Sequence, residues 1–364
     1  MKMQQQLDMI LIMGITGSGK SYFINKLASE TVVEESAHLA SCKHRNLSSE
    51  LLCNTNILGT ATCALIPAVI GSRDVILVDT PGFDDTVRSD SDILSTITSA
   101  LIGQYKLGFR LRGVVWIHKI SEDRFQGSAM KTLRIFQKIC GESAFKHVTL
   151  ATSRWEKTDE ALGGVHEYDL RQDFWRFMLD NGSKMERYYG DRETAIVIVS
   201  RLLDGPDVVL EIQREILQEH RALEQTSAGV LVSTKVEKAL EEKQQERDYL
   251  EELRRTLTDR DVEYKRSIED QWRKNKEALQ VLKNDQALLH EDLGRKIDEK
   301  LELIKSKSKS SKWKKGGKVL LSLLPTAIGL LGMLAGIPTG FTGLDKLWDD
   351  ESGIGSSISD FFDS

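Results

Sequence analysis

The stretch that decides the fold is Gly14-Ile15-Thr16-Gly17-Ser18-Gly19-Lys20-Ser21. It fits the pattern GxxxxGK[ST] and lies between an apolar run at residues 9–13 and an amphipathic run at residues 22–28. Small residues in such a loop let backbone N–H groups turn inward around a phosphate, at the positive end of a helix dipole. The sequence therefore predicts a phosphate-binding loop in which Lys20 meets the β- and γ-phosphates and Ser21 ligates Mg²⁺. The other predicted contacts with the nucleotide come from Gly14, Thr16, Gly17, Ser18 and Gly19.

A second motif supports the first. Residues 75–78 are apolar and are followed by Asp79-Thr80-Pro81-Gly82-Phe83. A carboxylate at the end of a buried strand can hold Mg²⁺ through water, opposite Ser21. Gly82 is expected to turn its N–H toward a γ-phosphate, which is how a nucleotide switch senses the third phosphate. Asp-x-x-Gly is a weak signal alone and a strong one after a phosphate loop.

Short apolar runs alternate with amphipathic stretches through the first two hundred residues. This pattern predicts an α/β fold with a mostly parallel sheet. A turn-like connection, Gly71-Ser72-Arg73-Asp74, makes the second and third strands an antiparallel hairpin at one edge, as in a P-loop GTPase. The expected strands are residues 9–13, 65–70, 75–78, 114–117, 148–151 and 195–199.

Composition sets the broad class. Fifty Lys and Arg against fifty-five Asp and Glu give a net charge of −5, which argues against a general nucleic-acid binder. No CxxC pair is present, and no cleavable apolar leader precedes the first motif, so a cytoplasmic protein with reduced thiols is expected. The four thiols belong to Cys42, Cys53, Cys63 and Cys140.

Residues 206–304 are rich in Glu, Lys, Gln, Arg and Leu, with leucines spaced by threes and fours, and residues 207–324 contain no proline. This pattern predicts a long helical, coiled-coil-like stalk after a first domain at residues 8–205. A break is expected near residues 226–229. An intermolecular coiled coil and a helix pair folded back on the first domain are both open.

The C-terminal part combines charge with hydrophobicity. Residues 305–318 form a polybasic segment with seven lysines and no acid, and residues 319–344 carry no charge until Asp345. A basic flank before an apolar segment predicts attachment to an anionic membrane surface. The alternative is an apolar hairpin packed on the first domain. Residues 345–364 are expected to be a flexible acidic tail.

Four motifs together carry a resemblance to a known family. They resemble the immunity-associated (GIMAP-like, avirulence-induced-gene type) G domains, most of all the fungal members, over about residues 8–224. The resemblance implies a Toc- and septin-related GTPase fold, GTP or GDP with Mg²⁺, and a homodimer. The motifs are the phosphate loop, Asp79-Thr80-Pro81-Gly82-Phe83-Asp84-Asp85, Gly113-Val114-Val115-Trp116-Ile117-His118-Lys119-Ile120-Ser121, and Ser128-Ala129.

The sequence departs from this family where a threonine should follow Ser41-Cys42, because Lys43 stands there. Thr60 lies nineteen positions before Asp79, about where the family's threonine would fall, so residues 43–59 are interpreted as an insertion. Thr60 is accordingly predicted to contact Mg²⁺ and the γ-phosphate, with Thr62 as the second choice.

The element that reads the base is also altered. Thr152-Ser153-Arg154-Trp155 follows the strand at 148–151, with no acid in the position where G domains present an Asp to guanine. Thr152 and Trp155 are the predicted nucleoside contacts, with Arg154 as an alternative stacking group. Glu156 or Asp159 could supply a displaced carboxylate, and Ser200-Arg201 is a weak base-edge candidate.

Phe83 occupies the place of a water-orienting Gln, so slow turnover is expected and no catalytic residue is identified. The leading hypothesis is a slow GTPase acting as a membrane-associated switch or oligomerising scaffold. The alternative is a structural coiled-coil protein whose degenerate G domain binds nucleotide weakly. An ATP-dependent enzyme is disfavoured by the Asp-x-x-Gly motif. Available but unassigned polar groups are Arg88, Arg110, Arg112 and His118.

Overall fold

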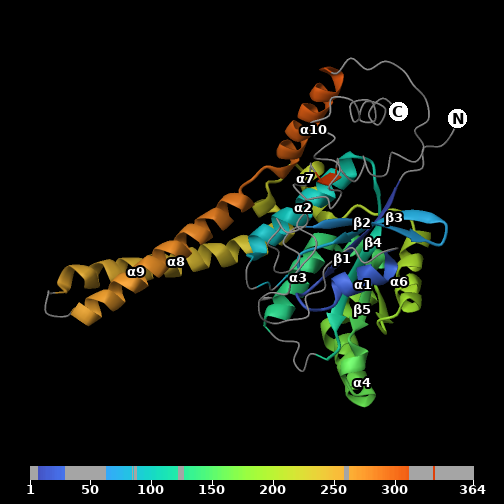
Figure 1. Ribbon diagram of the computed structural model, residues 1–364, viewed down its shortest axis with the longest axis horizontal. Helices are drawn as coiled ribbons and strands as arrows, with labels where there is room; N and C mark the ends of the chain where they lie inside the picture. Colours follow the sequence, from blue (N-terminus) through green and yellow to red (C-terminus); the bar gives the residue numbers. More distant parts are fainter. Residues whose placement is uncertain are drawn as a thin grey trace, which may run out of the picture.

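The computed structural model describes residues 7–28, 63–83, 85, 88–121, 127–257, 262–310 and 331–332. It shows an α/β body from which a long pair of helices projects (Figure 1). The body contains one six-stranded sheet in the order β2-β3-β1-β4-β5-β6. The expected fold class, a mostly parallel sheet followed by a long helical region, is therefore confirmed.

The sheet has a parallel core with one antiparallel edge. Its strands are β1 (Asp8–Gly14), β2 (Ala64–Ile70), β3 (Arg73–Asp79), β4 (Arg110–Lys119), β5 (Val148–Ser153) and β6 (Lys184–Arg187). Only β2 runs antiparallel to its neighbour, with Ala64 opposite Asp79 and Ile70 opposite Arg73. Gly71, at φ +64°, makes the tight turn between the two strands. The predicted edge hairpin is present.

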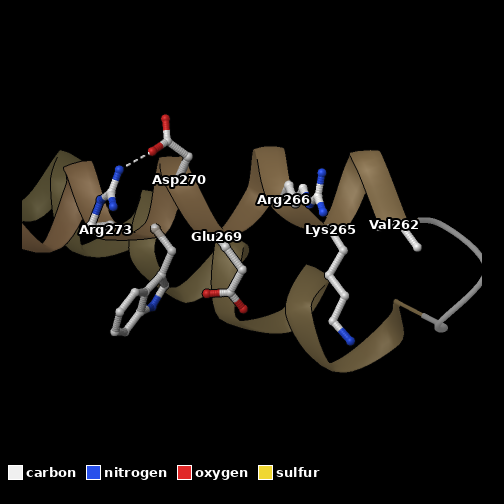
Figure 2. Close-up of a pocket in the computed structure, with 7 residues that line it drawn as sticks. Val262, Lys265, Arg266, Glu269, Asp270 and Arg273 are labelled. Atoms are coloured by element: carbon white, nitrogen blue, oxygen red, sulfur yellow. Dashed lines mark hydrogen bonds and ion pairs between the residues drawn. The ribbon is translucent and has the colours of Figure 1, made fainter.

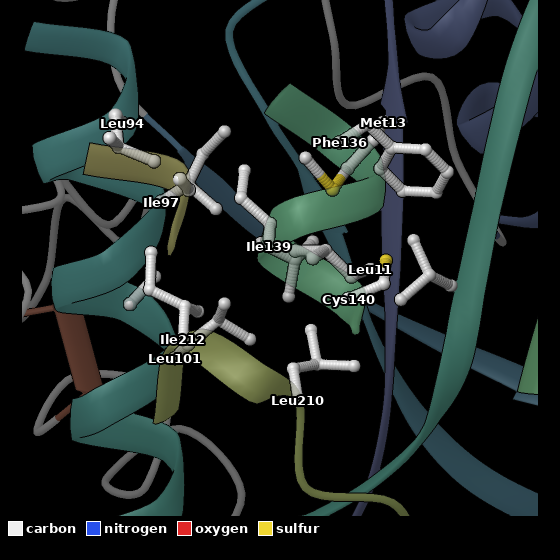
Figure 3. Close-up of a cluster of buried hydrophobic side chains, with 14 of the residues drawn as sticks. Leu11, Met13, Leu94, Ile97, Leu101, Phe136, Ile139, Cys140, Leu210 and Ile212 are labelled. Carbon is white, nitrogen blue, oxygen red and sulfur yellow. The ribbon is translucent and has the colours of Figure 1, made fainter. Parts of the chain in front are cut away.

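Alternate residues of β1 enter different cores, as the two-residue period of a strand requires. Leu11 and Met13 join the larger core, under α2 (Asp90–Lys106), α3 (Ser128–Cys140) and α7 (Glu211–Leu217). Figure 3 shows this cluster between the sheet and these helices. Ile10 and Ile12 join the second core, under α1 (Lys20–Leu27) and α6 (Arg192–Asp204).

The expected strand at residues 195–199 is wrong, because these residues lie inside α6. The run Ala-Ile-Val-Ile-Val is rich in β-branched residues, which favour strands. A cap decides otherwise: the Asp191 carboxylate accepts from Thr194 N at 2.7 Å, and Ala195, Ile198, Val199 and Leu202 then bury one helical face. The sixth strand is β6, which contains no apolar run from which it could have been predicted.

A second group of elements continues the body between β5 and α6. They are the 3₁₀ turn η2 (Trp155–Lys157), α4 (Glu160–Asp169), the π-helical turn η3 (Leu170–Phe174) and α5 (Arg176–Asp180). The 3₁₀ turn η1 (Glu142–His147) precedes β5. Glu167 of α4 bonds to Arg187 of β6, which links this group to the edge of the sheet.

The helical region is confirmed, and α8 (Ser227–Thr256) begins where a break was expected. Thr226 caps it, its hydroxyl accepting from Gly229 N at 3.0 Å, after the short 3₁₀ turn η4 (Leu223–Gln225). α9 (Val262–Leu289) packs against α8, and the pair extends away from the body (Figure 1). Inside the pair, Asn275 Nδ2 donates to Lys243 O at 3.1 Å. The stalk is thus an intramolecular helix pair.

The helical region is bonded to both ends of α2. At the N-terminal end, the Ser89 hydroxyl donates to Asp285 of α9, and Lys235 of α8 pairs with Asp90 at 2.7 Å. At the C-terminal end, Lys106 pairs with Asp298 of α10 (Leu293–Ser310). α2 is therefore shared between the body and the helical region.

Most of the C-terminal segments lie outside the described residues. Lys305, Lys307 and Lys309 belong to α10. Of the uncharged run at 319–344, the structure describes Leu331 and Gly332, and Leu331 is fully buried in the larger core. Within the described ranges, no helix combines the length and apolarity needed to cross a bilayer.

Candidate nucleotide site

The phosphate loop leaves the end of β1 and closes at the start of α1. Its glycines are required by geometry at two points. A Cβ on Gly14 would lie 2.2 Å from Ile117 O of the neighbouring strand, and Gly19 begins α1 at φ +95°. Both positions exclude a side chain. The loop therefore holds its backbone close to β4 and presents the first turn of α1 to the space that it encloses.

Lys20 folds back over this loop. Its ammonium donates to Gly14 O at 3.1 Å and to Ile15 O at 2.9 Å. The residue is buried, and this burial lowers its pKa to about 8 against the opposing attraction of Asp79 and Asp85. A buried cation whose hydrogen bonds within the described residues go to loop carbonyl oxygens is well placed to exchange them for phosphate oxygens.

Ser21 and Asp79 meet as the two motifs predict. Ser21 Oγ donates to Asp79 Oδ2 at 2.9 Å. Parallel pairing brings them together, because Ile12 of β1 lies opposite Asp79 of β3. A hydroxyl and a carboxylate are hard oxygen ligands of the kind that Mg²⁺ takes alongside phosphate oxygens.

The loop also contains a buried hydroxyl that fits a nucleotide. Ser18 Oγ is inaccessible to solvent and has no hydrogen-bond partner among the residues that the structure describes. Buried polar atoms are normally satisfied, so an orphan in a phosphate loop fits an anionic oxygen. The donor set, Lys20, the Ser18 and Ser21 hydroxyls and the loop amides, is therefore suited to a polyphosphate with Mg²⁺.

The Asp-x-x-Gly segment lies against the phosphate loop. A Cβ on Gly82 would stand 2.5 Å from Thr16 Oγ1 and 2.7 Å from Thr16 N. Thr16 N donates to Phe83 O at 3.1 Å, which joins the two segments. The Phe83 ring is fully buried in the larger core. The residue in the usual place of the water-orienting Gln thus packs inward, and Gly82 remains beside the loop.

Ser153 ties the base-side strand to the phosphate loop. Its hydroxyl, at the end of β5, donates to Ser18 O at 2.7 Å and lies 3.2 Å from His118 O. Ser153 is not among the residues predicted from the sequence, and its one signal there is its position two residues past the expected strand.

Thr152 and Trp155, the predicted nucleoside contacts, are both buried. Trp155 Nε1 donates to Thr152 O at 3.2 Å, and the Arg187 guanidinium lies 4.2 Å from the centre of the indole. Glu167 of α4 holds Arg187 in place, accepting from its Nε at 3.0 Å. Arg187 therefore covers one face of the ring that was expected to stack on a base.

The two candidate carboxylates have different surroundings. Asp159 caps α4, accepting from Ala161 N at 3.0 Å and Leu162 N at 3.3 Å. Glu156 is mostly exposed and lies 3.7 Å from Arg154. Asp159 is therefore committed to the helix, while Glu156 stands beside Arg154.

Other residues singled out from the sequence lie elsewhere. Thr60 and the insertion at 43–59 fall outside the described residues. Ser200 and Arg201 are part of α6, and Arg201 pairs with Glu186. They do not follow a strand, so the suggested base-edge element is wrong.

The unassigned polar groups are structural. Arg88 pairs with Asp92 at 2.6 Å, and Arg110 pairs with Asp8 at 2.9 Å. Arg112 donates to Leu203 O at 2.6 Å. Burial lowers the pKa of His118 to about 3, so this imidazole is neutral at physiological pH.

A cavity of about 670 Å³ lies near the far end of the helix pair. Figure 2 shows its lining on α9, where Arg273 is paired with Asp270. Side chains of both charges line it, and it is remote from the phosphate loop (Figure 1). It therefore forms no part of the nucleotide site. Its lining residues are Val262, Lys265, Arg266, Glu269, Asp270, Trp272 and Arg273.

Comparisons with known proteins give distant similarities. No protein-family model matches the chain, and no curated protein matches it. Among solved structures, Toc33 from Arabidopsis thaliana with Mg²⁺ and GMPPNP has a TM-score of 0.40 at 13% identity, covering 56% of this chain and 87% of that one. Toc33 with GDP and Mg²⁺ has a TM-score of 0.41 at 13% identity, covering 57% and 88%.

A translation factor is also similar. Elongation factor SelB from Methanococcus maripaludis, in complex with the GTP analogue GppNHp, has a TM-score of 0.36 at 9% identity. That match covers 56% of this chain and 35% of SelB. At these TM-scores the likeness is remote, and the functional assignment rests on the residues of this chain.

Proposed function

We propose that this protein binds GTP and GDP with Mg²⁺ at the phosphate loop and works as a slow GTPase switch or scaffold. The observation that carries the proposal is the convergence of three predicted elements in one place. Lys20 lies over the loop, Ser21 is bonded to Asp79, and Gly82 stands against Thr16. Motifs separated by some sixty residues meet as the chemistry of a nucleotide switch requires.

Each residue has a role in this proposal. Lys20 supplies a charge to the β- and γ-phosphates, and the loop amides and the Ser18 hydroxyl donate to phosphate oxygens. Ser21 and Asp79 hold Mg²⁺, with Thr60 as the further ligand from the segment before β2. Bound Mg²⁺ would neutralise charge on the phosphates. Thr152 and Trp155 border the nucleoside.

The switch role is supported by the short separation in sequence between Gly82 and α2, which begins at Asp90. Ser89, the N-cap residue of α2, bonds to Asp285 of α9, and Asp90 pairs with Lys235 of α8. A shift of the Gly82 segment on nucleotide exchange would therefore act on a helix to which the helical region is bonded. We propose that this coupling produces a nucleotide-dependent conformational change or dimerisation, through the G domain or the helix pair.

Slow turnover belongs to the same proposal because the buried Phe83 ring cannot orient water. We place the protein in the cytoplasm, attached to an anionic membrane surface by residues 305–344. The partners proposed are guanine nucleotide, a second copy of the chain and membrane lipid, without nucleic acid.

A second candidate function is a structural coiled-coil protein with a degenerate nucleotide domain. One observation favours it: position 155 carries a tryptophan that Arg187 covers, instead of an acid facing the base. Nucleotide binding distinguishes the two candidates.

The decisive variant is Lys20→Ala, tested by titrating a fluorescent GTP analogue with Mg²⁺. We expect binding to weaken about 100-fold or more, because the cation that meets the phosphates is removed. Circular dichroism checks the fold, and Lys131→Ala, an exposed lysine on α3, is the matched control. Equal affinity for Lys20→Ala and the wild type would show that the loop is not the binding site.

A further inference from the structure

We infer that Arg154 is the residue that selects guanine, by donating from its guanidinium to O6 and N7 of the base. This inference rests on the proposed function, since it names the specificity determinant of that nucleotide site. It is carried by the backbone of Arg154, the position of its side chain and the hydrogen-bonding pattern of guanine.

The backbone of Arg154 is held in an uncommon conformation. Its φ is +65°, in the left-handed region, and among the described residues only His220 shares a positive φ without being glycine. Such a conformation persists where neighbours impose it, and it concentrates at functional sites. Ser153 is bonded to the phosphate loop on one side, and the Trp155 indole is bonded to Thr152 on the other.

The side chain lies along the junction between the phosphate loop and α1. Arg154 Nε is 3.8 Å from the point that a Cβ of Gly19 would occupy, and the guanidinium carbon is 5.9 Å from the centre of the Tyr22 ring. Its ion-pair partner is Glu156 at 3.7 Å, a mostly exposed carboxylate. With 31% of its side chain accessible, Arg154 brings a reachable fork of N–H donors to the nucleoside side of the loop.

The chemistry of a guanidinium decides which base it fits. Arg carries five donors and no acceptor. Guanine presents two acceptors, O6 and N7, on one edge, whereas adenine presents N7 beside an amino donor that an Arg cannot accept. A bidentate contact from one guanidinium is therefore possible with guanine, whereas the amino group of adenine opposes it. This selection of guanine needs no carboxylate at position 155.

The competing groups are engaged elsewhere. Asp159 caps α4, and Arg187 covers the Trp155 ring. A guanidinium can also pair with the α-phosphate, which GTP and ATP share. That contact would strengthen binding of both nucleotides equally, so nucleotide competition separates the two roles.

The experiment uses the full chain and two variants. Arg154→Gly removes the side chain while suiting the positive φ, and Arg154→Lys keeps the charge without the fork. Lys157→Ala, in the same loop segment, is the matched control. Each protein is loaded with a fluorescent guanine nucleotide and competed with GTP, ITP, 7-deaza-GTP and ATP. ITP keeps O6 and N7 and lacks the 2-amino group.

Wild type and Lys157→Ala are expected to bind ITP as well as GTP, and to bind 7-deaza-GTP and ATP about tenfold more weakly. In Arg154→Gly, GTP affinity is expected to fall about tenfold while ATP affinity is unchanged. Arg154→Lys should recover part of the preference, because one donor can still reach O6 or N7.

Three results would overturn the inference. Arg154→Gly weakening GTP and ATP by one factor would place the contact on phosphate or ribose. ITP binding far more weakly than GTP would show that the 2-amino group is read by a carboxylate. Equal wild-type affinity for GTP and ATP would leave no guanine preference to explain. Failure of the proposed function looks different, because Lys20→Ala would then bind nucleotide like the wild type.

Discussion

At the scale of single residues, Lys20 combines two properties that oppose one another. Its ammonium must be charged to meet phosphates, yet burial lowers its pKa to about 8 from 10.5. The negative charges of Asp79 and Asp85 offset part of this lowering of the Lys20 pKa. The lowered pKa therefore brings the titration of this buried ammonium closer to neutral pH.

This pKa predicts how nucleotide affinity depends on pH. At about pH 7, Lys20 is mostly charged before and after binding, so it adds little pH dependence to the affinity. Above about pH 8, the free protein is neutral at Lys20 while the bound phosphates favour the charged form, so binding takes up a proton. Affinity should then fall by up to about tenfold per pH unit.

Calorimetry at pH 7 and pH 9, in buffers of different ionisation enthalpy, measures both the affinity and the proton uptake. Lys20→Arg is the control, because a guanidinium stays charged across this range and should remove the inflection. Affinity that does not change between pH 7 and pH 9 in the wild type would rule out the lowered pKa.

The convergence of the phosphate-loop residues was predictable from the sequence, and the surroundings of the base-side residues were not. Lys20, Ser21, Asp79 and Gly82 converge because fixed motif spacing meets a fixed strand pairing. The bond from Ser153 to Ser18 joins residues 135 positions apart, and no local pattern encodes such a pairing. Arg187 escaped prediction because β6 has no apolar run.

At the scale of elements, local propensity and capping disagree once, and capping prevails. The β-branched run at residues 195–199 predicts a strand, but Asp191 caps a helix and the apolar residues fall on one helical face. A four-residue edge strand, β6, completes the sheet. Periods of three and four predict the long helices correctly, since α8 and α9 are long enough for the pattern to repeat.

Helix α8 is anchored to the body by a glycine in its first turn. A Cβ on Gly229 would stand 1.8 Å from Leu223 O and 2.7 Å from the carbonyl carbon. The carbonyl belongs to backbone, which cannot rotate away as a side chain could. We expect Gly229→Ala to lower the free energy of unfolding by about 1–3 kcal/mol, the usual cost of overpacking.

Gly164→Ala is the matched control, because Gly164 is also helical, in α4, and nothing lies within 4 Å of its added Cβ. There the better helix propensity of alanine should stabilise by about 0.5–1 kcal/mol. Thermal unfolding followed by circular dichroism compares the two. A Gly229→Ala protein as stable as Gly164→Ala would mean that α8 is not packed this tightly on η4.

At the scale of the whole molecule, the α/β body does not end where the helical region was expected to begin, near residue 206. Residues Leu210, Ile212 and Ile216, around α7, and Leu223 of η4 are buried in the same core as the central strands. The composition shift near residue 206 predicted a stalk, yet packing of α7 on α2 and α3 makes its first part a layer of the body. Composition predicts that a segment is helical, but it does not predict which helix packs on the α/β body.

The C-terminal segments set two physical tendencies against each other. Lysines at 305–318 are attracted to an anionic surface at about 1 kcal/mol each. The uncharged run at 319–344 gains by burial, either in lipid or in the protein. Leu331 is buried in the larger core, so at least this residue already has apolar contacts within the molecule.

We predict that the full chain floats with anionic liposomes, because lysines and apolar side chains together bind more strongly than either alone. A truncation after Ile304 should stay soluble. Changing the seven lysines to Gln should remove the preference for anionic over neutral lipid. Flotation at low and high salt separates the contributions, since salt screens the lysines and leaves apolar burial intact. If the truncation aggregates while the full chain stays monomeric and never floats, the uncharged run covers the core that holds Leu331, and membrane attachment is refuted.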